Sequence, residues 1–348
     1  MRYKLFGKHT GLRVSELVLG TGNFGTGWGH GAEADEARRI FDAYANAGGN
    51  FIDTADGYQG GQSEQILGDL LAGRRDEFVL ATKFSLRADP KAGILVTGNS
   101  RKAMVSSVEA SLKRLKTDRV DLYWVHMSDG VTPIEEIVRG FDDLVRAGKI
   151  LYAGLSDFPA WRVARAVTLA ELRGSAPIAG IQVEHSLVER TTEQELLPAG
   201  HALGLGIVAW SPLGGGMLTG KYRQGEKGRL EGFGGRVFQP ENSPQRTAIL
   251  DTLIAIAKDI GVTPGEVAIA WVAVKGSLPI IGPRTVAQLE NNLAAANVKL
   301  SPEQVARLDE VSAIPRVFPY TVLNELGTRQ RMAGGKLDLL DLPVEPVA

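Results

Sequence analysis

NFIDTADGY, at residues 50–58, sets two chemically active side chains directly after a short apolar strand. Phe51 and Ile52 predict the end of a buried strand, Asp53 follows at its carboxyl end, and Tyr58 lies in the loop beyond. A carboxylate and a phenol held at one rim favour proton chemistry over packing. We therefore expect the rest of the chain to hold Tyr58 beside a second reactant.

The composition is that of a globular protein in water, because 44% of the 348 residues are hydrophobic and 23% are charged. The net charge of -1 provides no global field that would recruit nucleic acid or an anionic membrane. The chain has no cysteine, so disulfides and thiolate metal sites are excluded, and we expect no bound metal. No apolar run is long enough for a signal peptide or a membrane span, so we expect a cytoplasmic protein.

Short apolar strands alternate with amphipathic helices along most of the chain. Strands are expected at residues 17–19, 51–53, 78–82, 122–125, 150–155, 178–183, 206–210 and 279–281. The helices between them are expected to be capped by Ser63, Ser100, Thr132, Thr192, Ser243, Thr263, Thr285 and Ser301. A hairpin is expected within residues 3–14 and a long loop at 223–243, and no element is assigned after residue 314.

This alternation predicts a parallel sheet with helices on its faces. Eight strand–helix units predict an α/β fold of the (β/α)8 TIM barrel type, with an N-terminal β-hairpin and extra helices and loops at the C-terminal rim. We expect residues 1–348 to form a single domain with a tail at 315–348. An open doubly wound sheet is the alternative, and GTGNFG at 20–25 nominally matches its dinucleotide fingerprint. We reject that fingerprint because the next helical pattern starts only near Asp35.

In such a barrel, three consecutive strand ends bring Asp53, Tyr58, Lys83 and His126 to one rim. A phenol has a pKa of about 10, and a neighbouring ammonium lowers that pKa. Lowering it to about 7 requires roughly 4 kcal/mol, at about 1.36 kcal/mol per pKa unit. Asp53 would keep Lys83 charged and oriented, and His126 would hydrogen-bond the substrate oxygen. The predicted set donates a proton to a carbonyl oxygen or withdraws one from an alcohol.

A second group of residues, after the last two strands, suits a hydride donor that carries phosphates. The glycines of SPLGGG at 211–216 offer backbone donors, and Arg284 stands one residue before the helix cap Thr285. Trp210 could stack on a nicotinamide ring. The residues expected to hold the carboxamide and the phosphates are Ser156, Asp157, Gln182, Lys221, Arg284, Gln288 and Asn292. A monoester phosphate and a pyrophosphate are what NADPH presents.

From about Leu5 to about Leu308, the chain resembles the aldo-keto reductases, in particular their bacterial and potassium-channel-β-subunit-like branch. The motifs that carry the resemblance are NFIDTA at 50–55 with Tyr58, ATK at 81–83, VH at 125–126, GLS at 154–156, SPL at 211–213, and GPR at 282–284 with Gln288 and Asn292. The resemblance implies an eight-stranded barrel that binds NADPH without a Rossmann fold. It also implies a catalytic tetrad of Asp53, Tyr58, Lys83 and His126. The predicted cofactor contacts are Thr21, Gly22, Asn23, Asp53, Ser156, Asp157, Gln182, Trp210, Ser211, Pro212, Leu213, Gly215, Lys221, Gly282, Arg284, Gln288, Asn291 and Asn292.

The chain departs from this family pattern at several positions. Many members carry Asn where Asp157 stands, and Lys and Arg where Gly282 and Gln288 stand. Arg284 is then the main charge for a 2′-phosphate, so we expect NADPH and NADP+, with NADH as a weaker alternative. The channel-subunit relatives replace the histidine, whereas His126 is present here, which favours catalysis.

The sequence therefore predicts an NADPH-dependent enzyme that reduces an aldehyde or ketone to an alcohol, reversibly, with Tyr58 as general acid and base. A regulatory protein that senses NADPH is the alternative, and a lyase or isomerase that forms a Schiff base on Lys83 is a third hypothesis. Phe24, Trp28 and Met127 are expected to line the substrate pocket with Tyr58 and His126, together with the loop at 223–243. The partner we expect is a small carbonyl compound or alcohol, with no nucleic acid and no membrane.

Overall fold

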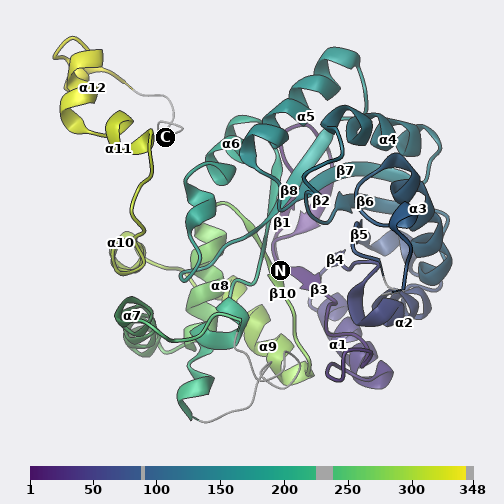
Figure 1. Cartoon of the computed structure of the whole chain (residues 1–348). Helices are drawn as coiled ribbons and strands as arrows, with labels where there is room; N and C mark the ends of the chain where they lie inside the picture. Colours follow the sequence, from purple (N-terminus) through teal and green to yellow (C-terminus); the bar gives the residue numbers. More distant parts are fainter. Residues whose placement is uncertain (88–90, 225–237, 342–348) are drawn as a thin grey trace.

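The computed structural model describes residues 1–87, 91–224 and 238–341 (Figure 1). Its barrel strands are β3 (Val18–Gly20), β4 (Phe51–Asp53), β5 (Val79–Phe84), β6 (Val120–Val125), β7 (Ile150–Ser156), β8 (Ile178–Glu184), β9 (Gly206–Trp210) and β10 (Leu278–Ile281). Within these ranges, eight parallel strands close a barrel in the order β10-β3-β4-β5-β6-β7-β8-β9. The predicted (β/α)8 barrel is confirmed, and the open doubly wound sheet is excluded.

A short hairpin closes the barrel at the amino ends of its strands. Its strands β1 (Tyr3–Leu5) and β2 (Arg13–Ser15) pair antiparallel, as expected. Phe6, which follows β1, lies with its ring centroid 5.7 Å from that of Phe51 and 6.4 Å from that of Trp124. Gly206 makes room for this ring, because a Cβ there would lie 2.5 Å from it. The hairpin thus fills the end of the barrel opposite the predicted site.

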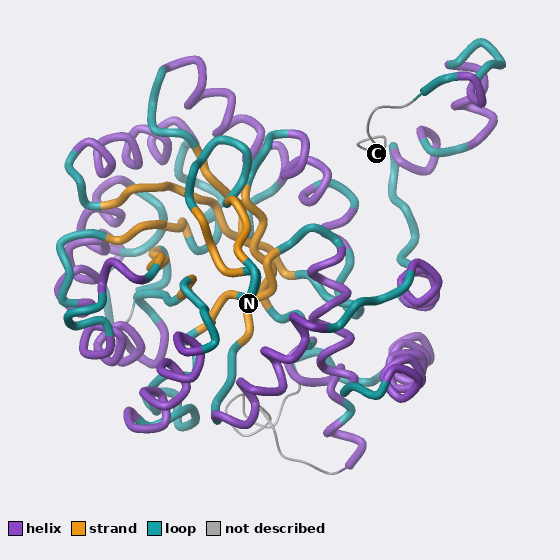
Figure 2. The backbone as a smooth tube through the Cα atoms, turned by 180° about the vertical axis from the view of Figure 1, so that it is seen from behind, coloured by secondary structure: helices purple, strands orange, loops and turns teal. Residues whose placement is uncertain are grey.

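The helices surround the barrel, as Figures 1 and 2 show. They are α1 (Ala34–Asn46), α2 (Gln62–Leu70), α3 (Arg101–Leu115), α4 (Ile134–Arg146), α5 (Ala160–Arg173), α6 (Leu196–Ala202), α7 (Pro244–Ile260), α8 (Pro264–Val274), α9 (Val286–Ala294) and α10 (Pro302–Val311). Short 3-10 turns are η1 (Tyr58–Gly61), η2 (Arg75–Glu77), η3 (Ile94–Val96), η4 (Thr191–Glu193), η5 (Gly214–Thr219), η6 (Lys221–Gln224), η8 (Ala295–Asn297) and η9 (Leu337–Leu339).

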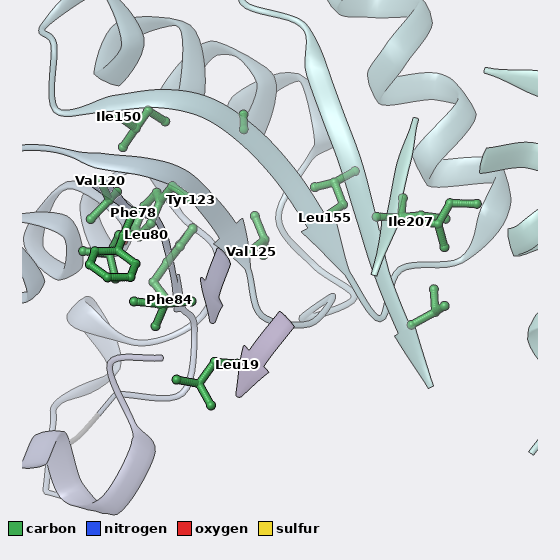
Figure 3. Close-up of a cluster of buried hydrophobic side chains, with 14 of the residues drawn as sticks. Leu19, Phe78, Leu80, Phe84, Val120, Tyr123, Val125, Ile150, Leu155 and Ile207 are labelled. Atoms are coloured by element: carbon green, nitrogen blue, oxygen red, sulfur yellow. The ribbon is translucent and has the colours of Figure 1, made fainter. Parts of the chain in front are cut away.

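Side chains that alternate along each strand build two layers of core. In β6, Leu122 and Trp124 belong to the cluster inside the barrel, whereas Tyr123 and Val125 belong to the layer between barrel and helices. Figure 3 shows part of that outer layer, where Phe84 stacks on Tyr123 with ring centroids 5.1 Å apart. The packed interior makes the barrel a rigid support for side chains at its rim.

Five of the expected caps are confirmed, and three are wrong. The confirmed caps are Ser100, Ser243, Thr263, Thr285 and Ser301, each of which accepts a backbone N–H of its helix. Each wrong cap donates its hydroxyl to a partner elsewhere: Ser63 to the carbonyl oxygen of Thr21, Thr132 to Asp129, and Thr192 to the carbonyl oxygen of Glu184. Ser, Thr and Asp side chains can either cap a helix or hydrogen-bond to other nearby groups, so the sequence motif alone does not show which of the two they do.

The segment after α10 leaves the barrel, and Figure 1 shows its helices α11 (Tyr320–Leu323) and α12 (Leu326–Met332) standing apart from it. Helices this short have too few turns to show a clear period of apolar residues, so the sequence pattern predicts no helix after residue 314. Of the long loop expected at 223–243, residues 225–237 lie outside the described residues. Over the part of the chain that the structure describes, no helix is long and apolar enough to cross a membrane.

Candidate active site

A cavity of about 680 Å³ opens where the barrel strands end at their carboxyl termini. It brings together most of the residues that the sequence predicted for the site. The predicted residues that line it are Gly22, Asn23, Trp28, Asp53, Tyr58, His126, Met127, Ser156, Asp157, Gln182, Trp210, Ser211, Pro212, Leu213, Gly215, Lys221, Gly282, Arg284, Gln288, Asn291 and Asn292. The location agrees with the general rule that sites in this fold lie at the carboxyl ends of the strands.

Three predicted residues lie behind the cavity wall. Lys83 and Thr21 are fully buried, and Thr21 donates its hydroxyl to the backbone oxygen of Asp53 at 3.1 Å. Phe24 is also fully buried, since its backbone pairs with Ala32 and its ring packs in the hydrophobic core. The prediction that Phe24 lines the substrate pocket is therefore wrong. Burying an aromatic ring in the hydrophobic core stabilises the fold more than leaving the ring exposed at the rim.

Lys83 is the centre of the polar network under the cavity. Its Nζ forms a short ion pair with Asp53 Oδ2, donates to the Thr54 carbonyl oxygen at 2.7 Å, and lies 3.1 Å from the Tyr58 hydroxyl. Burial lowers the pKa of Lys83, but Asp53 and then Tyr58 raise it more, and the net pKa lies above its ordinary value. The amine is therefore a charged ammonium that touches the phenol.

Asp53 is held from two strands. One carboxylate oxygen pairs with Lys83 on β5, and the other accepts a hydrogen bond of 2.9 Å from Gln182 Nε2 on β8. The carboxylate is buried, so Asp53 and Lys83 form a buried ion pair beneath the cavity, and the carboxylate keeps its hydrogen bond to Gln182. This arrangement fixes the direction in which the Lys83 ammonium points.

The loop that carries Tyr58 is pinned by Gln59, a residue that the sequence did not single out. Gln59 is fully buried and adopts a left-handed backbone conformation with φ 52°. Its side-chain amide donates to the Gly22 carbonyl oxygen at 2.9 Å and accepts from the Trp28 backbone N–H at 2.9 Å. A buried glutamine with both ends paired ties the Tyr58 loop to the loop after β3. Nothing in the local sequence separates it from an exposed loop glutamine.

His126 follows β6 and faces Tyr58, with ring centroids 5.9 Å apart and ring planes at 78°. Burial, and then the charge of Lys83, lower the pKa of His126 to about 3. The imidazole is therefore neutral at any physiological pH. Its Nδ1 is buried and has no hydrogen-bond partner among the described residues. Trp28 closes the same end of the cavity, with its ring centroid 6.0 Å from that of Tyr58.

Ser156 and Asp157 form the next part of the wall, at the end of β7. The Ser156 hydroxyl is buried and has no partner within the described part of the chain. Asp157 has φ 50°, and its Oδ1 accepts a hydrogen bond of 3.1 Å from Trp210 Nε1. Burial raises the pKa of Asp157 to about 6. These groups give the wall a hydroxyl, a carboxylate and an indole within one region.

The far end of the cavity is built from glycines and helix starts. Gly215 and Gly216 have φ of 65° and 95°, and a Cβ on Gly216 would lie 2.9 Å from Lys221 Nζ. The Arg284 backbone N–H donates to Gln288 Oε1 at 2.9 Å, just before α9 begins. Exposed backbone donors, helix amino termini and the two cations Lys221 and Arg284 favour bound phosphates. This part of the wall therefore suits a ligand that carries phosphates.

Sequence reasoning missed several residues of this wall. The lining residues that it did not single out are Gly20, His30, Thr219, Thr263, Pro264, Gly265, Glu266, Ile280 and Ile281. Gly216 and Phe238 also line the cavity, and they belong to the stretches 211–216 and 223–243 that the sequence predicted for the site. The capping box at Thr263 was found, but a cap says nothing of what the helix end faces. Within the described ranges, no cluster of His, Asp and Glu side chains could hold a metal ion.

Comparison with known proteins identifies relatives of this chain. The model of the aldo/keto reductase family matches residues 16–313. The chain is 36% identical to norsolorinic acid reductase of Aspergillus flavus, over 94% of this chain and 85% of that protein. It is 39% identical to the uncharacterized oxidoreductase YrpG of Bacillus subtilis, over 89% of this chain and 96% of that protein. It is 34% identical to aryl-alcohol dehydrogenase (NADP+) of Phanerodontia chrysosporium, over 93% of this chain and 89% of that protein. The chain belongs to the aldo/keto reductase family and is an NAD(P)H-dependent oxidoreductase that acts on carbonyl or alcohol groups.

Proposed function

We propose that this enzyme uses NADPH to reduce an aldehyde or ketone to an alcohol, reversibly, with Tyr58 as the general acid and base. The observation that carries the proposal is the contact of 3.1 Å between the Lys83 ammonium and the Tyr58 hydroxyl, at the floor of a cavity large enough for a dinucleotide. A proton donor at the end of such a cavity matches the need of carbonyl reduction.

Each of the four rim residues has a part in moving the proton. Tyr58 gives its phenolic proton to the carbonyl oxygen, and Lys83 stabilises the phenolate that remains. Asp53 keeps Lys83 charged and aimed at the phenol. The neutral His126 donates a hydrogen bond to the same substrate oxygen and so holds it near Tyr58. In the reverse direction the phenolate takes the proton from the alcohol.

The residues around the cavity fit a nicotinamide cofactor. When bound, the nicotinamide supplies the hydride that a carbonyl carbon needs for reduction. The Ser156 hydroxyl, which has no partner among the described residues, would hold the carboxamide with Asp157 and Gln182, and Trp210 would cover the ring. Of the described lining residues near the helix starts, Lys221 and Arg284 are the cations that would bind phosphates. We assign the 2′-phosphate to Arg284, so NADPH should bind more tightly than NADH.

We further propose that the substrate is an aryl or otherwise apolar carbonyl compound. Trp28 and Met127 at the mouth keep 44% and 38% of their surface exposed, which leaves an aromatic and a thioether side chain for a flat substrate. The names of the relatives, an aryl-alcohol dehydrogenase and a norsolorinic acid reductase, support this class.

The Schiff-base hypothesis fits the geometry poorly. A Schiff base needs a neutral amine that a substrate can reach. Lys83 is fully buried, its pKa lies above the ordinary value, and it pairs with Asp53. We therefore retain the hypothesis of a carbonyl reductase, and the experiment below also tests the alternative of a regulatory protein that senses NADPH.

The test is a panel of aryl and alkyl aldehydes and ketones, followed by the loss of reduced nicotinamide absorbance with NADPH and with NADH. We expect turnover with aryl aldehydes and a higher kcat/KM with NADPH. Tight NADPH binding with turnover no faster than a no-enzyme control across the panel would favour the sensor. Borohydride trapping of a substrate on Lys83 would overturn the reductase.

A further inference from the structure

Asp157 places a carboxylate in the wall where the nicotinamide ring is proposed to lie. We propose that Asp157 responds to the charge of that ring, so that the site holds NADP+ more tightly relative to NADPH than a neutral residue would. This inference rests on the proposed function, because it needs a nicotinamide in this cavity.

The carboxylate is held rigidly against the cavity. Asp157 follows β7 directly, its backbone N–H donates to the Gln182 carbonyl oxygen at 3.1 Å, and Trp210 holds Oδ1 at 3.1 Å. Its φ of 50° lies in the left-handed region, which aspartate and asparagine tolerate better than most residues. Because both backbone and side chain are fixed, the carboxylate cannot swing into solvent when a ring arrives.

Among the residues that the structure describes, the charges around Asp157 leave its carboxylate largely uncompensated. Lys83 on β5 attracts it, but the Lys83 ammonium is already paired with Asp53. Glu184 on β8 repels it, and His126 after β6 is neutral at physiological pH. Trp210 on β9 contributes a hydrogen bond and no charge. A cation placed beside Asp157 would therefore be stabilised by it.

The two states of the cofactor differ in ring charge. Oxidised nicotinamide is a cation and reduced nicotinamide is neutral, whereas the phosphates and the ribose are the same in both. In carbonyl reduction, a hydride with its two electrons passes from the ring to the carbonyl carbon, and Tyr58 adds the proton to the oxygen. Positive charge thus develops on the ring as the hydride leaves. Asp157 would stabilise that charge and favour hydride donation.

The preference should depend on pH. Burial, opposed by the Trp210 hydrogen bond and by Lys83, raises the pKa of Asp157 to about 6. The ratio of the NADPH to the NADP+ dissociation constant should rise as pH increases through that value, because the ionised form binds the cation better. An interaction of about 1.4 kcal/mol corresponds to a tenfold change in this ratio. Titration of the 2′-phosphate changes the affinities for NADPH and NADP+ alike, so its effect cancels in the ratio of the dissociation constants.

The experiment measures the dissociation constants of NADP+ and NADPH by calorimetry at about pH 5 and about pH 8, for the wild type, Asp157→Asn and Trp210→Phe. We expect the wild-type ratio to rise about fivefold between these values, because bound NADP+ keeps part of the carboxyl ionised even at about pH 5. In Asp157→Asn the ratio should stay flat, and about tenfold below the wild type at the higher pH. Trp210→Phe keeps the carboxylate but loses a hydrogen bond that lowers its pKa, so the rise should remain and shift to higher pH.

Equal ratios in the wild type and Asp157→Asn at the higher pH would overturn the inference. If Asp157→Asn does not fold, the wild type decides, since a ratio that is flat between the two pH values also overturns it. A wild type that binds neither nucleotide would contradict the proposed function itself, and this outcome is distinct from binding with a flat ratio.

Discussion

Replacing Lys83 with methionine removes the charge on which the proposed Tyr58 chemistry depends. Methionine is apolar and of similar length, so it can fill the fully buried space that Lys83 occupies. The substitution takes away the contact with the Tyr58 hydroxyl and leaves the Asp53 carboxylate with its Gln182 hydrogen bond. Tyr58 and the cavity wall stay unchanged.

The magnitude follows from the separation of 3.1 Å between Lys83 Nζ and the phenol oxygen. Two unit charges at that distance interact by about 5 kcal/mol at an effective dielectric constant of about 20. At about 1.4 kcal/mol per factor of ten, hydride transfer should slow by about a thousandfold or more. Loss of one member of a buried ion pair should also lower the free energy of unfolding by about 3–5 kcal/mol.

The assay is the single-turnover rate of NADPH oxidation with saturating aldehyde, measured with the NADPH dissociation constant and a urea melt. A matched double variant, Asp53→Asn with Lys83→Met, removes both charges and should recover much of the stability without recovering the rate. A folded Lys83→Met protein that transfers hydride within tenfold of the wild type would refute the reasoning.

Three further predictions concern other titratable or charged groups. Burial and then Lys83 hold the pKa of folded His126 at about 3, below the unfolded value of about 6.5, so its contribution to stability is complete above about pH 6.5 and is lost on acidification. In urea melts, His126→Gln should therefore lose about 2 kcal/mol less than the wild type between about pH 7 and 5. Burial and then Glu64 raise the pKa of Asp56 to about 7, so the free energy of unfolding falls as pH rises from about 4 to about 7. Asp56→Asn should therefore raise the free energy of unfolding by about 2–4 kcal/mol at about pH 8 and change it little at about pH 4. Arg284→Ala should weaken NADPH binding about 10-fold to 100-fold in calorimetry and change NADH binding little, because a charge-assisted hydrogen bond contributes about 1.5–3 kcal/mol; equal losses for both nucleotides would contradict the assignment of Arg284.

The barrel and its rim were predictable because they follow from short-range patterns and one geometric rule. Asp53 and His126 each stand at or just after the carboxyl end of a strand, and parallel strands bring their ends to the same rim. Lys83 was expected at a strand tip and is the penultimate residue of β5. The order of strands in the barrel is the order in the chain, so neighbours in sequence became neighbours in space.

The paths of loops and the directions of helix ends were not predictable. Phe24 turns inward because of a backbone pairing with Ala32 that no local pattern signals. Thr263 caps α8 as expected, yet the cavity beside it depends on the packing of α8 against distant segments. Gln59 needs two partners from another loop before its role is visible. Such long-range contacts determine which residues line the cavity wall, whereas the alternation of strands and helices determines only where in the fold the cavity lies.

The most direct test of the central claim is the Tyr58→Phe variant, which keeps the ring and removes the hydroxyl that Lys83 contacts. NADPH affinity, measured by calorimetry, should stay within about threefold of the wild type, and the melting temperature should change little. Single-turnover hydride transfer to an aldehyde should fall by about 10²–10⁴-fold, the usual contribution of a general acid. Hydride transfer at a rate close to the wild type in Tyr58→Phe, with NADPH bound, would contradict the account.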